Sequence, residues 1–317
     1  MASIAAPSPA ATTKKGGPGV WPYVYMTPLF VFVLLFTLIP AFFTVLIAFS
    51  NYSKFNRFDV LNLATYRWVG FDNFTEIFSL GGGFFPVVGW TVMWTFATSF
   101  LNIASGMVLA LLLNHPGLRE RNLYRAILII PWALPFILSV QMWGGLLNYE
   151  GVYNQIIGMF GLAPVRWLQT TWAARAAVLV LNMWLSYPYF MTVSLAALTA
   201  IPKDMYEAAD IDGARTWDKF RSITFPFMMM SLMPLVVVQL AQQFQNFGVI
   251  YLLTQGNPLA FPGADYGTTD TLVTYTYKII FNLQRYGLAS AYGIIIFLVV
   301  AAMTMINSRL TNAFRED

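Results

Sequence analysis

The sequence predicts an all-α integral membrane protein with six transmembrane helices, and three observations indicate this fold class. Hydrophobic residues make up 58% of the chain and charged residues only 10%, whereas a soluble domain has roughly 25% charged residues. The mean hydropathy is +0.61. Six apolar stretches are each long enough, as helices, to cross a hydrocarbon core of about 30 Å. The chain is therefore expected to lie in a bilayer.

The six predicted spans follow one another along most of the chain. They lie near residues 24–49, 89–113, 125–147, 174–199, 226–253 and 288–307. Several prolines fall inside them, where neighbouring helices or a cavity can satisfy the freed carbonyl groups. We expect kinks at these prolines: Pro40, Pro131, Pro135, Pro188 and Pro234.

The two ends of the chain are predicted to lie in the cytoplasm. Residues 1–19 are rich in Ala, Ser, Thr, Pro and Gly, and we expect a disordered cytoplasmic tail before a single transmembrane domain, residues 20–317. With this orientation the cytoplasmic segments hold eleven Lys and Arg residues and the outer segments seven. That bias agrees with the positive-inside rule.

Several kinds of chemistry are not expected. The chain has no Cys and one His, so it offers no disulfide, no thiolate and no histidine cluster for a metal. No carboxylate pair or activated nucleophile falls at membrane depth, so we expect no catalytic residue, no metal and no cofactor. A membrane-embedded enzyme is therefore a weak alternative.

A charged segment, residues 202–226, separates two apolar spans. Pro202 suits the first position of a short helix, and Gly213 can adopt the left-handed conformation that ends it. A second short helix is expected to carry an apolar stripe that rests on the spans, formed by Trp217, Phe220 and Ile223. An ordinary amphipathic loop with solvated charges is the alternative reading.

Span five contains four amides at helical spacing, Gln239, Gln242, Gln243 and Asn246. On one helix they line a single face, and that face must meet protein or water because lipid leaves amides unsatisfied. Amides donate and accept hydrogen bonds without charge, as a neutral polyhydroxylated molecule requires. Span four adds Asn182, Ser186 and Tyr189 on one face, with Trp184 and Tyr187 alongside. These groups could equally hold helices together.

Residues 207–226 resemble the signature of the permease subunits of ABC importers. Glu207, Ala208, Ala209 and Gly213 match its spacing, as do Ile223 and Pro226, while Phe225 stands where Leu is usual. The resemblance implies the type I permease fold with a cytoplasmic coupling helix, in which this segment docks on an ATPase. No Gly-x-x-x-x-Gly-Lys-Ser/Thr string occurs, so ATP hydrolysis is expected of the partner and this chain is not expected to be an enzyme.

The stretch from Trp68 to the C-terminus is similar to permeases of maltose and maltodextrin importers, the MalF type. The similarity rests on residues 182–189, 243–247, 252–258 and 269–277. It implies that the sugar-contacting positions are Ser139, Trp184, Leu185, Ser186, Tyr189, Gln242, Gln243 and Asn246. Gln239, Gln242 and Gln243 replace a serine, a phenylalanine and an asparagine of that type, which implies a different sugar or a different pose.

The resemblance also implies the partners and the location of the chain. We expect a multi-pass protein of the bacterial inner membrane, surrounded by lipid, that forms half of a translocation pathway for a neutral oligosaccharide. Its expected partners are a second permease subunit, two ATPase subunits and an external solute-binding protein, and no nucleic acid. The alternatives are a permease for another sugar, such as trehalose, and an ion-coupled secondary carrier. The latter usually needs an ionisable residue within a span, and the predicted spans hold only Arg175, close to one end.

Overall fold

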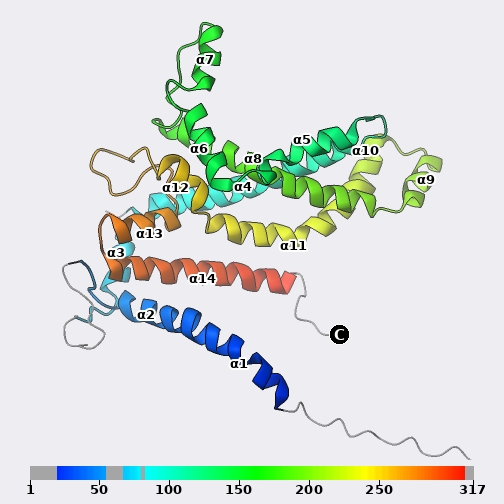
Figure 1. The fold of residues 1–317 in the computed structure, drawn as a ribbon. Helices are drawn as coiled ribbons and strands as arrows, with labels where there is room; N and C mark the ends of the chain where they lie inside the picture. Colours follow the sequence, from blue (N-terminus) through cyan, green and yellow to red (C-terminus); the bar gives the residue numbers. More distant parts are fainter. Residues whose placement is uncertain (1–19, 55–66, 80–82, 311–317) are drawn as a thin grey trace, which may run out of the picture. The chain divides into compact units, whose positions relative to one another are not determined.

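The computed structural model describes residues 20–54, 67–79 and 83–310, without the side chains of residues 307–310 (Figure 1). The predicted tail, residues 1–19, lies outside this part. Two compact units divide the chain, Met1–Leu46 and Ile47–Asp317. In the described residues the regular elements are helices, accompanied by two isolated β-bridges, Ser50 with Trp68 and Leu259 with Gly267. The all-α prediction is confirmed.

The first unit is one long apolar helix in three segments. They are α1 (Trp21–Val33), the π-helical turn η1 (Leu34–Leu38) and α2 (Ile39–Ala48), whose last two residues belong to the second unit. Together they run for 28 residues, enough to cross a membrane. The widened turn directly precedes Pro40, whose ring would clash with the carbonyl four residues back in a regular α-helix.

The second unit contains the remaining helices. They are α3 (Asp72–Ile77), α4 (Phe84–Leu113), α5 (Arg121–Ala133), α6 (Phe136–Leu146), α7 (Val152–Met159), α8 (Thr171–Thr199), α9 (Lys203–Ile211), α10 (Thr216–Lys219), η2 (Phe220–Thr224), α11 (Phe225–Phe244), α12 (Gly248–Thr254), α13 (Leu272–Phe281) and α14 (Tyr286–Leu310). Figure 1 shows α9 and α10 at one end of this unit and α12, α13 and their connecting loop at the other. We call these the α9 end and the α12 end.

Five of the six predicted spans are long apolar helices, and the third is broken. The five begin at Trp21, Phe84, Thr171, Thr216 and Tyr286. Where one helix was expected over residues 125–147, α5 and α6 meet at an angle of 95°. Pro135 disfavours helical geometry for the residue before it, and Leu134 accordingly has an extended ψ of 145°. The single-helix expectation is wrong here, although a kink at Pro135 was expected.

Span five also differs from its predicted bounds of 226–253. The helix starts earlier, because α10 and η2 continue directly into α11, so the expected separate second helix merges with the span. The π-helical turn η2 stands just before Pro226, as η1 does before Pro40. The helix ends at Phe244, and α12 begins only at Gly248. Asn246 therefore lies in the break and not on the helix.

Helices α4 and α8 form the centre of the second unit. The buried residues of α4 recur at three- and four-residue spacing, as an amphipathic helix requires. Among them Thr91, Thr95 and Thr98 donate to carbonyl oxygens one turn back, at 2.6 to 2.8 Å, and so bury no unpaired hydroxyl. At Gly106 the helices approach so closely that an added Cβ would lie 2.7 Å from the carbonyl carbon of Phe190. The absence of a side chain at Gly106 permits this contact.

A cap at the α12 end joins the start of α14 to α3. Asn73 donates to the carbonyl oxygens of Ala48 and Ser50, both at 2.8 Å. Glu76 on α3 forms a two-bond ion pair with Arg285. The contact with Glu76 raises the pKa of Arg285 above its usual value, so this guanidinium stays charged. The cap fixes the end of the bundle on which the connecting loop rests.

Gly106→Ala should destabilise the protein because its methyl group would meet backbone atoms of α8 at 2.7 Å. Overpacking of this kind typically costs about 1–3 kcal/mol. Gly89→Ala is the matched control, since a Cβ there meets nothing within 4 Å and the same helix gains a better helix former. Thermal unfolding of the two purified variants should show a lower midpoint for Gly106→Ala alone. Equal midpoints would contradict the close approach of α4 and α8.

Candidate functional site

A cluster of amide side chains joins α4, α8 and the break after α11. Asn246 donates to Asn182 Oδ1 at 3.3 Å and to Gln243 Oε1 at 3.2 Å. Asn182 in turn donates to Asn102 Oδ1 at 3.5 Å, a long contact between α8 and α4. Because Asn246 lies in the helix break, its side chain can turn back to meet both neighbours. The sequence pattern predicted these amides, except for Asn102.

The cluster is held in place by bonds to the main chain. Trp94 on α4 donates to the carbonyl oxygen of Gln243 at 3.1 Å, and Asn246 Oδ1 accepts from the N–H of Val249 at 3.4 Å. Asn102, Asn182 and Gln243 are buried. In the part of the chain that the structure describes, the side-chain nitrogens of Asn102 and Gln239 are buried without a partner. Such groups usually bind water or a ligand.

The expected continuous stripe on span five does not form. Gln239 and Gln243 are buried, Asn246 is half-buried beyond the helix end, and Gln242 is exposed. Gln242 and Gln243 are rotated by about 100° from each other around the helix. Gln242 therefore reaches the surface at the edge of the face that buries Gln243. The amides therefore divide into an inward group, bonded within the chain, and Gln242, which is free to meet something outside it.

The other positions predicted to contact sugar are distributed over two helices. On α8, Trp184, Leu185 and Ser186 are half-buried and Tyr189 is 37% exposed. Trp184 packs on Trp143 of α6, and Tyr189 on Trp132 of α5. Ser139 of α6 is buried and donates to the carbonyl oxygen of Pro135 at 3.2 Å. The bend between α5 and α6 thus lies beside the exposed face of α8 at Tyr189.

The charged segment forms a distinct projection at the α9 end (Figure 1). Pro202 precedes the first helical residue of α9, and Gly213 has a φ of +73°, as predicted for the end of this helix. The N–H of Ala214 closes the turn on the carbonyl oxygen of Ala209 at 2.9 Å. Tyr206 is hydrogen-bonded to Thr224 at 2.9 Å, and Lys219 is paired with Asp210, so the short helix is tied to the start of span five.

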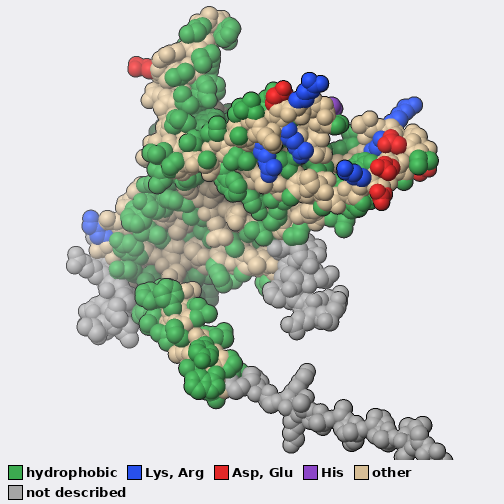
Figure 2. All heavy atoms as spheres, turned by 45° about the vertical axis from the view of Figure 1, so that its right-hand side comes forward, with side chains coloured by type: hydrophobic (Ala, Val, Ile, Leu, Met, Phe, Trp, Pro, Cys, Tyr) green, Lys and Arg blue, Asp and Glu red, His purple; other side chains and the backbone are tan. Residues whose placement is uncertain are grey.

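The exposed surface of this projection combines acidic and apolar side chains. Figure 2 shows acidic groups gathered there, and the exposed ones on α9 and its C-cap are Asp204, Glu207, Asp210 and Asp212. Ile211 is 88% exposed. Trp217 is 66% exposed and stacks on Phe220, while Ile223 is buried. The expectation that Trp217 rests on the spans is therefore wrong, because it lies exposed on the first turn of the span-five helix itself. Apolar groups so exposed indicate a docking surface.

A buried ion pair supports the loop between α12 and α13, and the sequence analysis did not find it. Asp270 Oδ2 accepts from Lys278 Nζ and from the N–H of Gly267, both at 2.6 Å. Asp270 Oδ1 accepts from the hydroxyl of Thr274 at 2.9 Å. Burial raises the pKa of Asp270, against the opposing effect of these donors. The pair lies outside the five long helices, and no motif or helical spacing in the sequence marks it.

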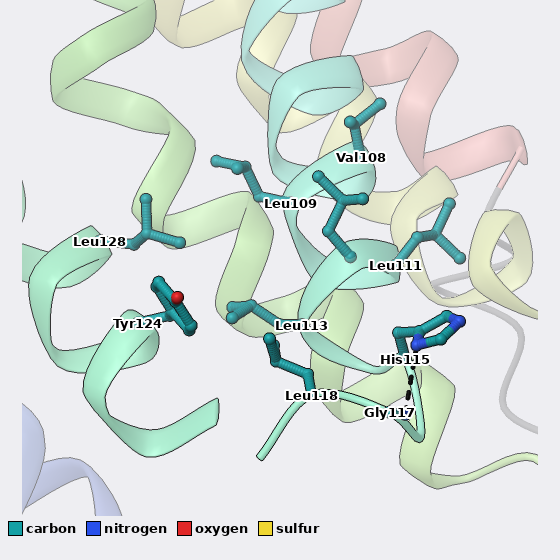
Figure 3. Close-up of a pocket in the computed structure, with 10 residues that line it drawn as sticks. Val108, Leu109, Leu111, Leu113, His115, Gly117, Leu118, Tyr124 and Leu128 are labelled. Atoms are coloured by element: carbon teal, nitrogen blue, oxygen red, sulfur yellow. Dashed lines mark hydrogen bonds between the residues drawn. The ribbon is translucent and has the colours of Figure 1, made fainter. Parts of the chain in front are cut away.

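An apolar pocket at the end of α4 is not suited to a sugar. It has a volume of about 720 Å³ and lies between the end of α4 and the start of α5, at the α9 end (Figure 3). Leucine and valine side chains dominate its wall, with Tyr124 and His115 at its edge. His115 Nδ1 is occupied by the N–H of Gly117 at 3.2 Å. A cavity with so few free polar groups cannot satisfy the hydroxyls of a sugar.

Metal chemistry finds no support in the described residues. Within the ranges 20–54, 67–79 and 83–310, no group of three or more His, Cys, Asp or Glu side chains could hold a metal ion.

Comparisons with known proteins agree on the kind of protein this chain resembles. The family profile described as "Binding-protein-dependent transport system inner membrane component" matches residues 102–316. The galactooligosaccharides transport system permease protein GanP of Bacillus subtilis is 36% identical over 94% of the chain and 71% of its own length. The maltodextrin transport system permease protein MdxF of the same organism is 32% identical over 94% and 70%.

Two further proteins are similar either over part of their length or at low sequence identity. The maltose/maltodextrin permease MalF of Escherichia coli is 39% identical over an aligned region that covers 76% of this chain and 49% of MalF. A crystal structure of a bacterial ABC transporter involved in the import of the acidic polysaccharide alginate contains a chain with a TM-score of 0.76. It covers 94% of this chain at 22% identity. At that identity it shows a shared fold.

Asn182→Ala should lower thermal stability, because it leaves Asn246 and Asn102 with fewer partners in a buried cluster. Loss of a buried partner costs about 1–3 kcal/mol. Gln242→Ala should leave the unfolding midpoint of the isolated chain within error, since Gln242 is exposed. Thermal unfolding of the two variants in detergent tests this division. A larger loss for Gln242→Ala than for Asn182→Ala would contradict it.

Proposed function

We propose that this chain, which belongs to the family of binding-protein-dependent transport system inner membrane components, is the permease subunit through which an ATP-driven importer passes a neutral oligosaccharide. The observation that carries this proposal is the projecting α9 segment with its left-handed Gly213. It presents acidic and apolar side chains away from the spans, as docking to a separate ATPase requires. Family membership leaves no place for the ion-coupled carrier or the membrane enzyme.

The chemistry of the amide cluster and the names of the relatives both support a neutral sugar as the substrate. Two relatives that share most of this chain are named as permeases for galactooligosaccharides and for maltodextrin. Amides provide donors and acceptors without a charge that would require a counter-ion. The neighbouring aromatic rings supply flat apolar surfaces on which sugar rings can stack. Both features support a neutral oligosaccharide.

The sugar-binding positions fall into two groups by accessibility. Gln242, Ser186, Tyr189 and Trp184 are exposed or half-buried, and they are proposed to contact sugar directly. Gln243 and Ser139 are buried. Leu185 is half-buried like Trp184 and Ser186, and Asn246, also half-buried, bonds to Gln243 and so joins the two groups. Sugar therefore binds where the open faces of α8 and α11 meet a second permease subunit, which supplies the other half of the pathway.

The proposed partners follow from what the chain lacks. It carries no Gly-rich phosphate-binding string with a Lys, so two ATPase subunits supply ATP hydrolysis. A solute-binding protein delivers the sugar at the α12 end. In this arrangement the protein is multi-pass in the bacterial inner membrane, with both termini and α9 in the cytoplasm. The excess of Lys and Arg in those segments supports that orientation.

Uptake by the complex reconstituted in vesicles tests the proposed function. ATP should drive uptake of maltodextrins or galacto-oligosaccharides with no ion gradient present, and a panel that includes maltose and trehalose identifies the sugar. Uptake that follows a proton or sodium gradient and ignores ATP would overturn the proposal.

Glu207→Lys and Gly213→Val should uncouple transport from ATP hydrolysis. The first places a wrong charge in the docking surface, and the second forces a β-branched residue into a left-handed φ of +73°. Transport should fall more than about tenfold, which is a change of about 1.4 kcal/mol in the activation barrier. Glu150→Lys is the matched control, because it reverses an exposed acidic charge in the loop before α7, outside the α9 projection. Uptake and ATPase rates of the three complexes give the comparison. Wild-type transport by both test variants would disprove the coupling role of α9.

Gln242→Ala and Tyr189→Ala should raise the sugar concentration needed for half-maximal transport. A lost hydrogen bond accounts for about 0.5–1.5 kcal/mol, and a lost aromatic contact adds a similar amount. The unfolding midpoint should stay unchanged for Gln242→Ala, because Gln242 is exposed, and should fall slightly for Tyr189→Ala, because Tyr189 loses its contact with Trp132. Unaltered sugar dependence, combined with a lower midpoint, would show that these residues only join subunits.

A further inference from the structure

Four aromatic rings form a continuous series from the amide cluster to the α12 end. Phe247, the residue after Asn246, stacks on Tyr251 with ring centroids 4.7 Å apart and an interplanar angle of 17°. Tyr277 of α13 contacts both, at 5.1 Å from Phe247 and 4.6 Å from Tyr251. Phe281 follows at 4.4 Å from Tyr277 and is 59% exposed. The series thus begins beside the proposed sugar cluster and ends at the surface.

A polar pocket opens beside the middle of this series. Its volume is about 340 Å³, within the usual range for small-molecule sites. Tyr251 and Tyr277 line it, together with three exposed amides, Gln255, Asn257 and Asn282. Among the described residues, none of these three amide side chains makes a hydrogen bond.

The floor of the pocket is rigid before any ligand arrives. Lys278 lines the pocket, but its amine is held by the buried Asp270. The carboxylate of Asp270 fills the space beside Gly256, where an added Cβ would lie 1.8 Å from Oδ1. Arg175 donates to the carbonyl oxygen of Thr268 at 2.9 Å, and its guanidinium lies 4.4 Å from the ring of Trp90. A preformed site binds without the entropic cost of ordering its loop.

We propose that Tyr251, Tyr277, Gln255, Asn257 and Asn282 form a second, outer sugar subsite that receives one ring of a neutral oligosaccharide. The tyrosine rings stack on the apolar face of the sugar, and the three free amides bind its hydroxyls. Phe247 connects this subsite to Asn246. The seven residues of α12 separate the two by about 10 Å, so a longer oligosaccharide contacts both and a disaccharide seated at the cluster contacts one. The proposal rests on the proposed function, which supplies the sugar.

Protection from alkylation tests this subsite directly, because the chain contains no Cys. Asn282→Cys places a single thiol of this chain in the pocket, and Phe281→Cys is the matched control on the adjacent exposed position outside it. The assembled complex is treated with a small maleimide, with and without the tetrasaccharide of the transported series, maltotetraose or galactotetraose. The sugar should slow labelling of Asn282→Cys at least threefold and leave Phe281→Cys unaffected. Equal labelling of Asn282→Cys with and without a sugar that the complex transports would overturn the proposal.

A second measurement separates sugar stacking from anchoring of the rings at the membrane interface. Tyr277→Ala should raise the half-saturating concentration of the tetrasaccharide about fivefold and that of the disaccharide less than twofold, while Tyr277→Phe keeps the ring and most of the affinity. Phe281→Ala removes an exposed aromatic from the same helix and should change neither value. An equal effect of Tyr277→Ala and Phe281→Ala on both sugars would assign the rings to interfacial anchoring. If the wild-type complex transports no neutral sugar, the proposed function fails and the subsite falls with it.

Discussion

The close approach of α4 and α8 at Gly106 is the contact on which the second unit depends. In a bilayer, apolar side chains gain little by exchanging lipid for protein, so helices associate through close packing and polar contacts. Gly106 lets the two backbones meet. The contact between Asn102 and Asn182 lies on the same face of α4, one turn before Gly106. Helix α11 packs against both α4 and α8, and α5 against α8, so the amide cluster and the exposed face of α8 are positioned by this pair.

Apolar content and span length were enough to predict the class and five of the spans, because a membrane helix must satisfy its backbone internally over a fixed thickness. The end of the short helix in the charged segment was also predictable, because only Gly readily adopts the φ found at Gly213. The 95° bend at Leu134 and Pro135 was not predictable in size. A proline can give a kink or a break, and the packing of neighbouring helices decides which.

Two features of the site required the three-dimensional structure. The end of α11 at Phe244 moves Asn246 off the helix, and no Gly or Pro in residues 244–247 marks that break in the sequence. Asn246 nevertheless reaches Gln243 and Asn182, so the predicted amides meet by a different geometry. The Asp270–Lys278 pair was missed because burial of a loop depends on residues far away in sequence, here Trp90 and Arg175, which bind the backbone at Thr269 and Thr268.

The division of amides between buried and exposed positions also limits which environment the outer face of α11 can contact. Gln243 and Asn182 are buried, and each accepts a hydrogen bond from Asn246 within the chain. Gln242 is exposed and, within the described residues, makes no hydrogen bond. An amide left in hydrocarbon without a partner costs several kcal/mol, so the face of α11 that carries Gln242 cannot lie against lipid. It must meet water or another polypeptide. The chain alone therefore presents a polar face that lipid cannot satisfy, which supports the proposed pairing with a second permease subunit.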